Sequence, residues 1–430
     1  MSPVEGPVAG ARSGPPERAR AVLDEAFREH WGRLLAVLAA GFRRLDLAED
    51  GLGEAFAAAA ERWPVDGPPD NPPAWLLTAA RRRVLDRLRA EAVAARKEPL
   101  LVMDAEQART ADGVMVDPGG LVTDERLRLV FLCAHPALAP EAAAALSLRL
   151  VVGVPTADIA RLFLVQESTM AARLTRAKRR LAATGAPFAV PPEGPARDAR
   201  VGVVASVAYL AFTAGYAPGS GPDVTRTTVA GEAIRLVRVL RELLPGEPAL
   251  DALLALMLLQ HSRRDARVGP DGLPVLLPDQ DRSRWHRDEV VEALELLEPL
   301  AAGEVGEVAA EYLLQALVAA EHACAPSAAD TRWDRIAALY AELEARTGSP
   351  VVRLNRAVAL AEAEGPAAGL ALLDGLDDRL PHSHRLPAVR AELLSRAGDA
   401  EGARAAYALA IERCANDAEL ALLRRRVEAL

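Results

Sequence analysis

Residues 156–182, TADIARLFLVQESTMAARLTRAKRRLA, contain two short helical patterns separated by a break, and the second is rich in arginine. Within the second pattern Met170, Leu174, Ala177 and Leu181 recur at helical spacing and predict one buried stripe. The basic side chains lie off that stripe, on the exposed side of the helix. A helix, a short turn and a second helix with exposed basic residues is the arrangement that reads the major groove of DNA. This stretch therefore predicts a DNA-binding helix-turn-helix.

The helix-turn-helix occurs in an acidic chain, with 51 Lys+Arg against 60 Asp+Glu and a net charge of −9. The charge is unevenly distributed, because residues 1–190 carry a net charge of +1 and residues 191–430 a net charge of −10. The basic stretch thus belongs to a neutral half of the chain. The 430 residues suffice for several domains, and the low aromatic content of 4 % with abundant Ala and Leu favours an all-α fold.

Helical periodicity and turn residues divide the chain into five parts. We expect a disordered tail over 1–20, a first helical block over 21–97, a linker over 98–122 that contains Pro118, Gly119 and Gly120, a second helical block over 123–186, and a large helical domain over 198–430. Within the first block, residues 80–97 carry seven basic side chains and two acidic ones. Such a helix either binds phosphates or is a solvated surface.

The last part of the chain contains a weak internal repeat. Ala357 and Leu360 are matched by Ala391 and Leu394, each 34 residues further on. Gly369 and Leu373 are matched in the same way by Ala403 and Tyr407. A period of 34 residues is typical of tetratricopeptide repeats, which are paired helices. The alternative is a helical bundle without a repeat.

Several classes of site have no support in the sequence. The three cysteines are far apart, and the pair His382 and His384 has no further ligand nearby in the sequence, so we expect no metal and no cofactor. No nucleotide-binding loop or nucleophile motif is present, and we expect no enzyme activity. The stretch DQDRSRW, 279–285, favours a structural contact over a catalytic cluster. No apolar run suits a membrane span or a signal peptide, so we expect a cytoplasmic protein.

Three segments together resemble a known family. Residues 46–89 are similar to region 2 of an extracytoplasmic-function (ECF) sigma factor, and residues 124–182 resemble its region 4. The stretches LLALMLLQHSRRDARVGPDGLPVLLPDQDRSRW, YLLQALVAAEHA and LNRAVALAEAEGPAAGLALLD resemble the subgroup with a C-terminal tetratricopeptide-like extension. The resemblance implies two small helical sigma domains followed by a large helical domain that modulates activity through a protein partner.

The resemblance also implies partners and site residues. In such sigma factors the helix AEDxxxEAF binds the clamp helices of the RNA polymerase β′ subunit, and region 4 contacts the β flap. The matching polymerase-binding residues here are Asp46, Glu49, Asp50, Glu54 and Phe56. Acidic side chains there complement a basic partner.

The same family reads two promoter elements. The candidates for the −10 element are Asn71, Arg81, Arg82, Arg83 and Arg87. The candidates for bases of the −35 element are Gln166, Glu167, Ser168, Thr169, Arg173 and Arg176, with Lys178 and Arg179 on phosphates. The linker would lie toward the RNA exit path.

This chain departs from the family pattern at three positions. Gly51 and Gly53 lie in the expected docking helix, where each costs roughly 1 kcal/mol of helix propensity. Gln166 replaces the usual proline or small polar residue of the turn, which puts the promoter preference in doubt.

Two alternatives to a sigma factor remain. One is a helix-turn-helix regulator that binds duplex DNA without polymerase and senses a ligand or partner through its helical domain. The other is a helical-repeat enzyme with an accessory DNA domain, which needs a catalytic cluster that the sequence does not show.

Overall fold

The computed structural model describes residues 15–95, 118–163, 165–185, 188–192, 194–216 and 227–430. Every regular element within these ranges is a helix, apart from one isolated β-bridge between Val268 and Pro274. The predicted all-α fold is confirmed. Most of the predicted tail and linker lies outside the described residues. Two helix starts differ from the prediction: the first helix begins at Pro15, and a helix begins at Pro118 within the expected linker.

The chain divides into two compact units, and the division crosses the predicted second block. The first unit contains residues 1–138, 149–154 and 174–191, and the second contains 139–148, 155–173 and 192–430. Residues 155–173 of the helix-turn-helix belong to the second unit and residues from 174 on to the first, whereas the sequence pattern predicts one block over 123–186.

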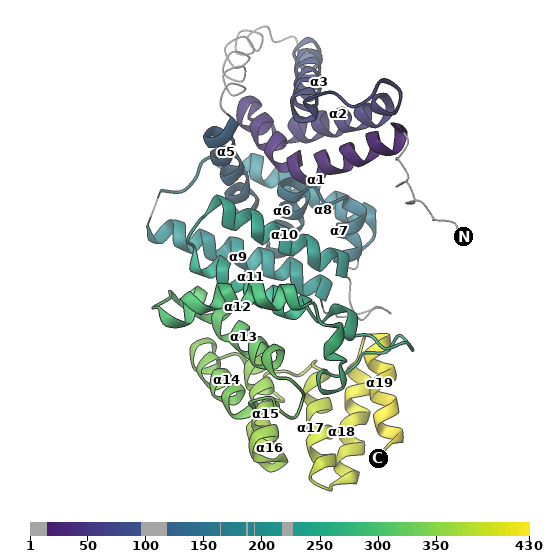
Figure 1. Cartoon of the computed structure of the whole chain (residues 1–430), viewed down its shortest axis with the longest axis vertical. Helices are drawn as coiled ribbons and strands as arrows, with labels where there is room; N and C mark the ends of the chain where they lie inside the picture. Colours follow the sequence, from purple (N-terminus) through teal and green to yellow (C-terminus); the bar gives the residue numbers. More distant parts are fainter. Residues whose placement is uncertain (1–14, 96–117, 164, 186–187, 193, 217–226) are drawn as a thin grey trace, which may run out of the picture. The chain divides into compact units, whose positions relative to one another are not determined.

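Four helices lie wholly within the described residues of the first unit. They are α1 (Pro15–Phe42), α2 (Leu45–Asp66), α3 (Pro72–Ala95) and α5 (Pro118–Cys133), drawn in purple to blue in Figure 1. The rings of Phe27, Trp31 and Phe56 pack together, with the centroids of Phe27 and Phe56 5.0 Å apart. This ring cluster joins α1 to α2.

Gly51 has a packing role that the sequence pattern does not reveal. A Cβ atom at Gly51 would lie 2.8 Å from Val84 Cγ2 and 3.1 Å from the carbonyl oxygen of Ala80. The missing side chain therefore allows α2 and α3 to approach closely, which offsets the lost helix propensity. Gly53 has no atom within 4 Å of such a Cβ position, so no packing requirement explains it.

The second unit contains the remaining helices, with α8 continuing into the first unit. They are α6 (Pro140–Ser147), α7 (Thr156–Leu162), α8 (Glu167–Thr184), α9 (Pro195–Tyr216), α10 (Thr227–Leu243), α11 (Pro248–His261), α12 (Arg287–Ala302), α13 (Glu307–Cys324), α14 (Trp333–Thr347), α15 (Pro350–Glu364), α16 (Pro366–Leu373), α17 (Arg385–Arg396), α18 (Ala400–Arg413) and α19 (Asp417–Glu428). The turn η1 (Leu148–Val152) connects α6 to the residues before α7. Nearly every residue of α11 is buried, as expected for a helix that is apolar on all sides.

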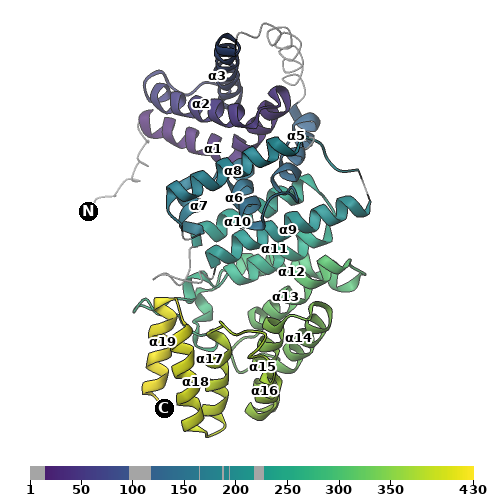
Figure 2. The ribbon, with the colours of Figure 1, turned by 180° about the vertical axis from the view of Figure 1, so that it is seen from behind.

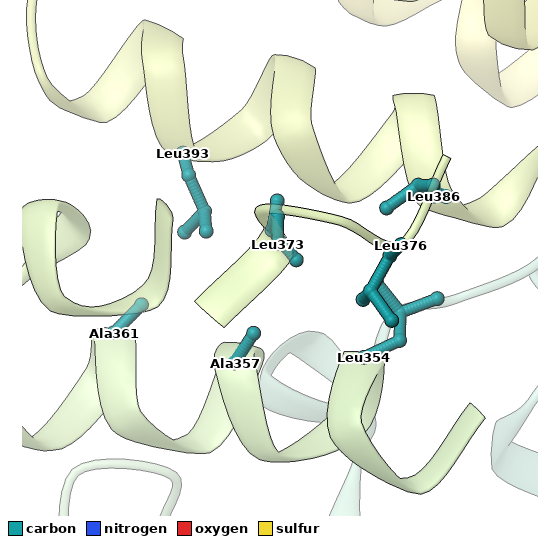
Figure 3. Close-up of a cluster of buried hydrophobic side chains, with 7 residues drawn as sticks. All are labelled: Leu354, Ala357, Ala361, Leu373, Leu376, Leu386 and Leu393. Atoms are coloured by element: carbon teal, nitrogen blue, oxygen red, sulfur yellow. The ribbon is translucent and has the colours of Figure 1, made fainter. Parts of the chain in front are cut away.

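The last helices pack as successive neighbours, α15 on α16 and α17 on α18, with α19 against α18 (Figures 1 and 2). In Figure 3, Leu373 lies between side chains of α15 and α17, including Ala357 and Leu393. Ala357 and Ala391, which are 34 residues apart, are both fully buried. Several of the periodic positions are thus core positions of these helix pairs, whereas Leu360 and Leu394 are half-buried.

Gly369 provides a test of this packing. A Cβ at Gly369 would lie 2.6 Å from the carbonyl oxygen of Ala357 and 2.9 Å from Leu393 Cδ1. We expect Gly369→Ala to lower the free energy of unfolding by about 1–3 kcal/mol through overpacking. Urea denaturation followed by circular dichroism measures this change. Gly231→Ala is the matched control, because α10 offers no atom within 4 Å there; equal effects of the two substitutions would contradict the packing.

Candidate functional site

The acidic side of α2 is partly exposed. Asp46 lies in the first turn and accepts two hydrogen bonds from the guanidinium of Arg44, at 3.0 and 2.9 Å. These bonds hold the pKa of the Asp46 carboxyl below its usual value. Arg44 also bonds Glu91 of α3 at 3.0 Å. Asp46 is therefore ionised and accessible, as a docking carboxylate requires.

Asp50 and Glu54 are paired with arginines of α3. Arg87 Nη1 lies 2.7 Å from Asp50 Oδ2, and its other terminal nitrogen bonds Glu54. Arg83 Nε lies 3.7 Å from Glu54. The bond to Asp50 raises the pKa of Arg87. All four side chains are more than a third exposed, so these pairs are weak and easily exchanged. Residues expected to bind polymerase and residues expected to bind DNA thus neutralise each other here.

Glu49 and Phe56 differ from the other docking candidates because both are buried, 8 % and 7 % exposed. Glu49 Oε1 accepts a hydrogen bond from Arg149 Nε at 2.7 Å, and Oε2 one from Lys178 Nζ at 2.9 Å. Phe56 belongs to the ring cluster of the core. In this arrangement the accessible part of the predicted docking set is Asp46, Asp50 and Glu54.

The predicted −10 candidates lie along α3. Asn71 precedes the helix, and its side-chain oxygen accepts a hydrogen bond from the backbone N–H of Ala74 at 3.1 Å, which caps the helix. Arg82 and Arg83 are exposed and line an open groove of about 530 Å³ between α2 and α3. Trp75 of α3 and Arg62 of α2 also line this groove. Arg62 was not among the sequence candidates, because it lies on the other helix. Arg81 is half-buried.

The helix-turn-helix itself is present. The first helix, α7, is preceded by Pro155 as its cap residue, and α8 begins at Glu167 after a turn that includes Gln166. Met170 and Leu181 are buried on the predicted stripe, which is therefore confirmed. The exposed members of the DNA-binding set are Gln166, Glu167, Ser168, Thr169, Arg176 and Arg179.

Among the −35 candidates, Arg173 and Lys178 are paired with acidic side chains of the protein. Arg173 Nη1 lies 3.1 Å from Glu141 Oε2, and its guanidinium lies 6.0 Å from the ring centre of Phe163. Lys178 is bonded to Glu49, and its side chain is 22 % exposed. Arg173 and Lys178 must exchange these partners before they can contact DNA.

One group of possible metal ligands occurs among the described residues. His384, Cys414 and Glu419 bring their ligand atoms within 4.8 Å of one another. Sequence spacing does not connect these residues, because Cys414 follows the end of α18 and Glu419 lies in α19. His384 Nε2 already bonds Glu419 at 2.7 Å, and Arg385 lies 3.8 Å from the same carboxylate. These contacts account for the group, and we assign no metal to it.

The stretch 279–285 makes structural contacts within the second unit. Arg282 Nη1 donates to the carbonyl oxygens of His322 and Ala325, at 2.6 and 3.0 Å. Its guanidinium lies 4.7 Å from the ring centre of Trp285, which is 3 % exposed. These contacts connect the segment to the end of α13, in agreement with the structural interpretation.

Comparisons with known families agree with this geometry. Residues 26–93 match Sigma-70 region 2, and residues 128–181 match Sigma-70, region 4. The chain therefore contains domains similar to sigma-70 regions 2 and 4, the two regions through which sigma factors bind core RNA polymerase and promoter DNA.

Most of the chain is similar to a bacterial relative, and a further segment matches a third family. Residues 200–301 match a family of unknown function, DUF6596. The chain is 41 % identical over 392 residues to the "Uncharacterized protein R00370" of Rhizobium meliloti (strain 1021), which covers 90 % of this chain and 91 % of that protein. It belongs to the same family as that protein. No solved structure matches it. In the described part of the chain, no helix has the length and apolar character of a membrane span.

Proposed function

We propose that this protein is an ECF-type sigma factor that binds core RNA polymerase and directs promoter-specific initiation of transcription. The observation that carries the proposal is the combination of an acidic α2, a basic α3 and the α7–α8 helix-turn-helix in one chain. The exposed carboxylates Asp46, Asp50 and Glu54 support binding of α2 to the β′ clamp helices, and the second block is the expected contact of the β flap. Complementary charge steers and orients such an encounter.

The proposed promoter contacts are those candidate side chains that are exposed in the structure. Arg82 and Arg83 beside the α2–α3 groove are the proposed contacts of the −10 element. The N-terminal part of α8, from Gln166 to Thr169, and Arg176 further along are the proposed readers of the −35 element. The start of a recognition helix is the part that reaches base edges in the major groove.

Run-off transcription with purified core polymerase tests the proposal. We expect discrete promoter-dependent products only when the protein is added, from templates chosen by transcript-start mapping after overexpression. A regulator that acts without polymerase predicts a different result: tight binding of the isolated protein to duplex DNA and no new transcript. Failure to obtain a product from any upstream region would refute the sigma assignment.

For the C-terminal domain we propose tetratricopeptide-like repeats that bind a protein partner and modulate sigma activity. The support is the 34-residue spacing of buried positions such as Ala357 and Ala391, in helix pairs α15–α16 and α17–α18. Stacked helix pairs offer extended surfaces to partners.

Truncation after residue 194 tests the role of this domain. In the second unit α6 packs on α9, and α6 includes the fully buried Ala144 and Leu146. We expect truncation to uncover α6 and to lower run-off transcription at least about tenfold, since the helix-turn-helix loses support. The assay compares equal amounts of soluble protein whose helical content circular dichroism has verified. Unchanged transcription by the truncated chain would show that the domain has no part in sigma activity.

A further inference from the structure

The first unit contains a contact between the expected docking helix and residues of the region 4 match. Both oxygens of Glu49 are occupied, one by Arg149 and the other by Lys178, and the carboxylate side chain is 9 % exposed. Because its carboxylate is buried and paired with two cations of the same chain, Glu49 is not accessible to a cation of the polymerase in this arrangement. Lys178 cannot contact a DNA phosphate and Glu49 at once, because its ammonium group is the one that pairs with the Glu49 carboxylate.

The backbone around Arg149 is fitted closely to α1. A Cβ at Gly32 would lie 2.1 Å from the carbonyl oxygen of Val151. The indole N–H of Trp31 donates to the carbonyl oxygen of Arg149 at 3.1 Å, and the Arg149 guanidinium lies 5.1 Å from the Trp31 ring centre. Only glycine at position 32 allows the backbones of α1 and Val151 to come this close. This fit indicates a closely packed, specific contact.

The other side of the same contact also depends on a glycine. Gly153 has a φ of +86°, and a Cβ there would lie 2.8 Å from Cγ of Trp31. Residues 149–154 therefore follow the surface of α1 closely, with Trp31 as the shared partner. We name this contact, formed by Trp31, Gly32 and Glu49 with residues 149–154 and Lys178, the interlock.

We propose that the interlock is an intramolecular competitor of core RNA polymerase: in the free protein it withholds the Glu49 carboxylate, and polymerase binding requires its release. This inference rests on the proposed function. The apparent affinity for polymerase is then reduced by the fraction of molecules in which the interlock is closed. Loosening the interlock should therefore strengthen polymerase binding, which is the opposite of what damage to a docking surface does.

Two glycines of α1 provide a matched pair of variants. Gly32→Ala inserts a methyl group against the Val151 backbone, whereas Gly41→Ala in the same helix meets no atom within 4 Å. Alanine raises helix propensity at both positions, so neither change should disturb α1 itself. Arg149→Met is a second opening variant that removes one partner of Glu49 without a steric clash.

Cys133 supplies a readout that does not need polymerase. Its thiol is fully buried, and burial together with the nearby Glu49 charge raises its pKa. The first measurement is the thiol labelling of Cys133 in the free protein, followed by peptide mass spectrometry. The second is the affinity of each full-length variant for core polymerase. We expect Gly32→Ala and Arg149→Met to label Cys133 and to bind polymerase at least about tenfold better than wild type, with Gly41→Ala unchanged.

The outcomes separate this inference from the proposed function. Equal Cys133 labelling in the Gly32→Ala, Arg149→Met and Gly41→Ala proteins would overturn the interlock. Faster labelling with unchanged or weaker polymerase binding would overturn its role as a competitor while leaving the sigma function intact. If neither wild type nor any opened variant binds polymerase, the sigma function itself fails, whatever the labelling shows.

Discussion

Replacing Asp50 with lysine is expected to abolish co-purification of this protein with core RNA polymerase. Asp50 is exposed on α2, where it forms an exchangeable surface ion pair with Arg87. Reversal of its charge converts an attraction to a basic clamp into a repulsion, for which we expect at least about a 100-fold loss of affinity. Glu54 remains to pair Arg87, and surface ion pairs contribute little to stability, so the fold should persist.

The matched control for Asp50→Lys is Glu61→Lys. Glu61 is exposed on the same helix, three turns further along, and the substitution changes the net charge by the same amount. We expect Glu61→Lys to bind polymerase within about threefold of wild type, because the effect of a charge depends on its place in the interface. If both variants lose binding equally, net charge rather than a docking site on α2 controls the association.

The helix content of this chain is predictable from sequence because it depends on local periodicity. Met170 and Leu181, spaced at helical intervals, are both buried on one stripe of α8. A proline often ends a helix, yet α2 continues through Pro64 to Asp66. A proline in the last turn removes only one hydrogen bond, so it does not terminate the helix at once.

Other features depend on contacts between residues distant in the chain, and periodicity does not report them. From the sequence alone, Gly51 only lowers the helix propensity of α2. In the structure its missing side chain allows α2 to approach Val84 of α3. The sequence pattern places Glu49 among the docking acids, but the structure buries it against Arg149 and Lys178, which are 100 and 129 residues further along the chain. A pattern that is correct for the helix therefore leaves open which acidic side chains are accessible to a partner.

Replacing Arg176 with alanine is expected to weaken recognition of the −35 element selectively. Arg176 is exposed on α8, off the buried stripe of Met170 and Leu174. A base-edge contact contributes about 1–3 kcal/mol of discrimination, so we expect about a 10- to 100-fold loss on the matching promoter. The loss should be small on a promoter whose −35 bases are scrambled. Binding of the polymerase complex to both fragments, at one fixed salt concentration, measures the difference.

Arg179→Ala is the informative comparison, because Arg179 is also exposed on α8 but is expected to contact phosphate. It should weaken binding to matching and scrambled promoters equally and lower the salt dependence by about one counterion. Arg161→Ala, on α7 and paired with Asp158, should change neither quantity. An Arg176→Ala protein that loses affinity equally on both fragments would assign Arg176 to phosphate as well. Base reading would then rest on the start of α8, from Gln166 to Thr169, where the turn departs from the family pattern.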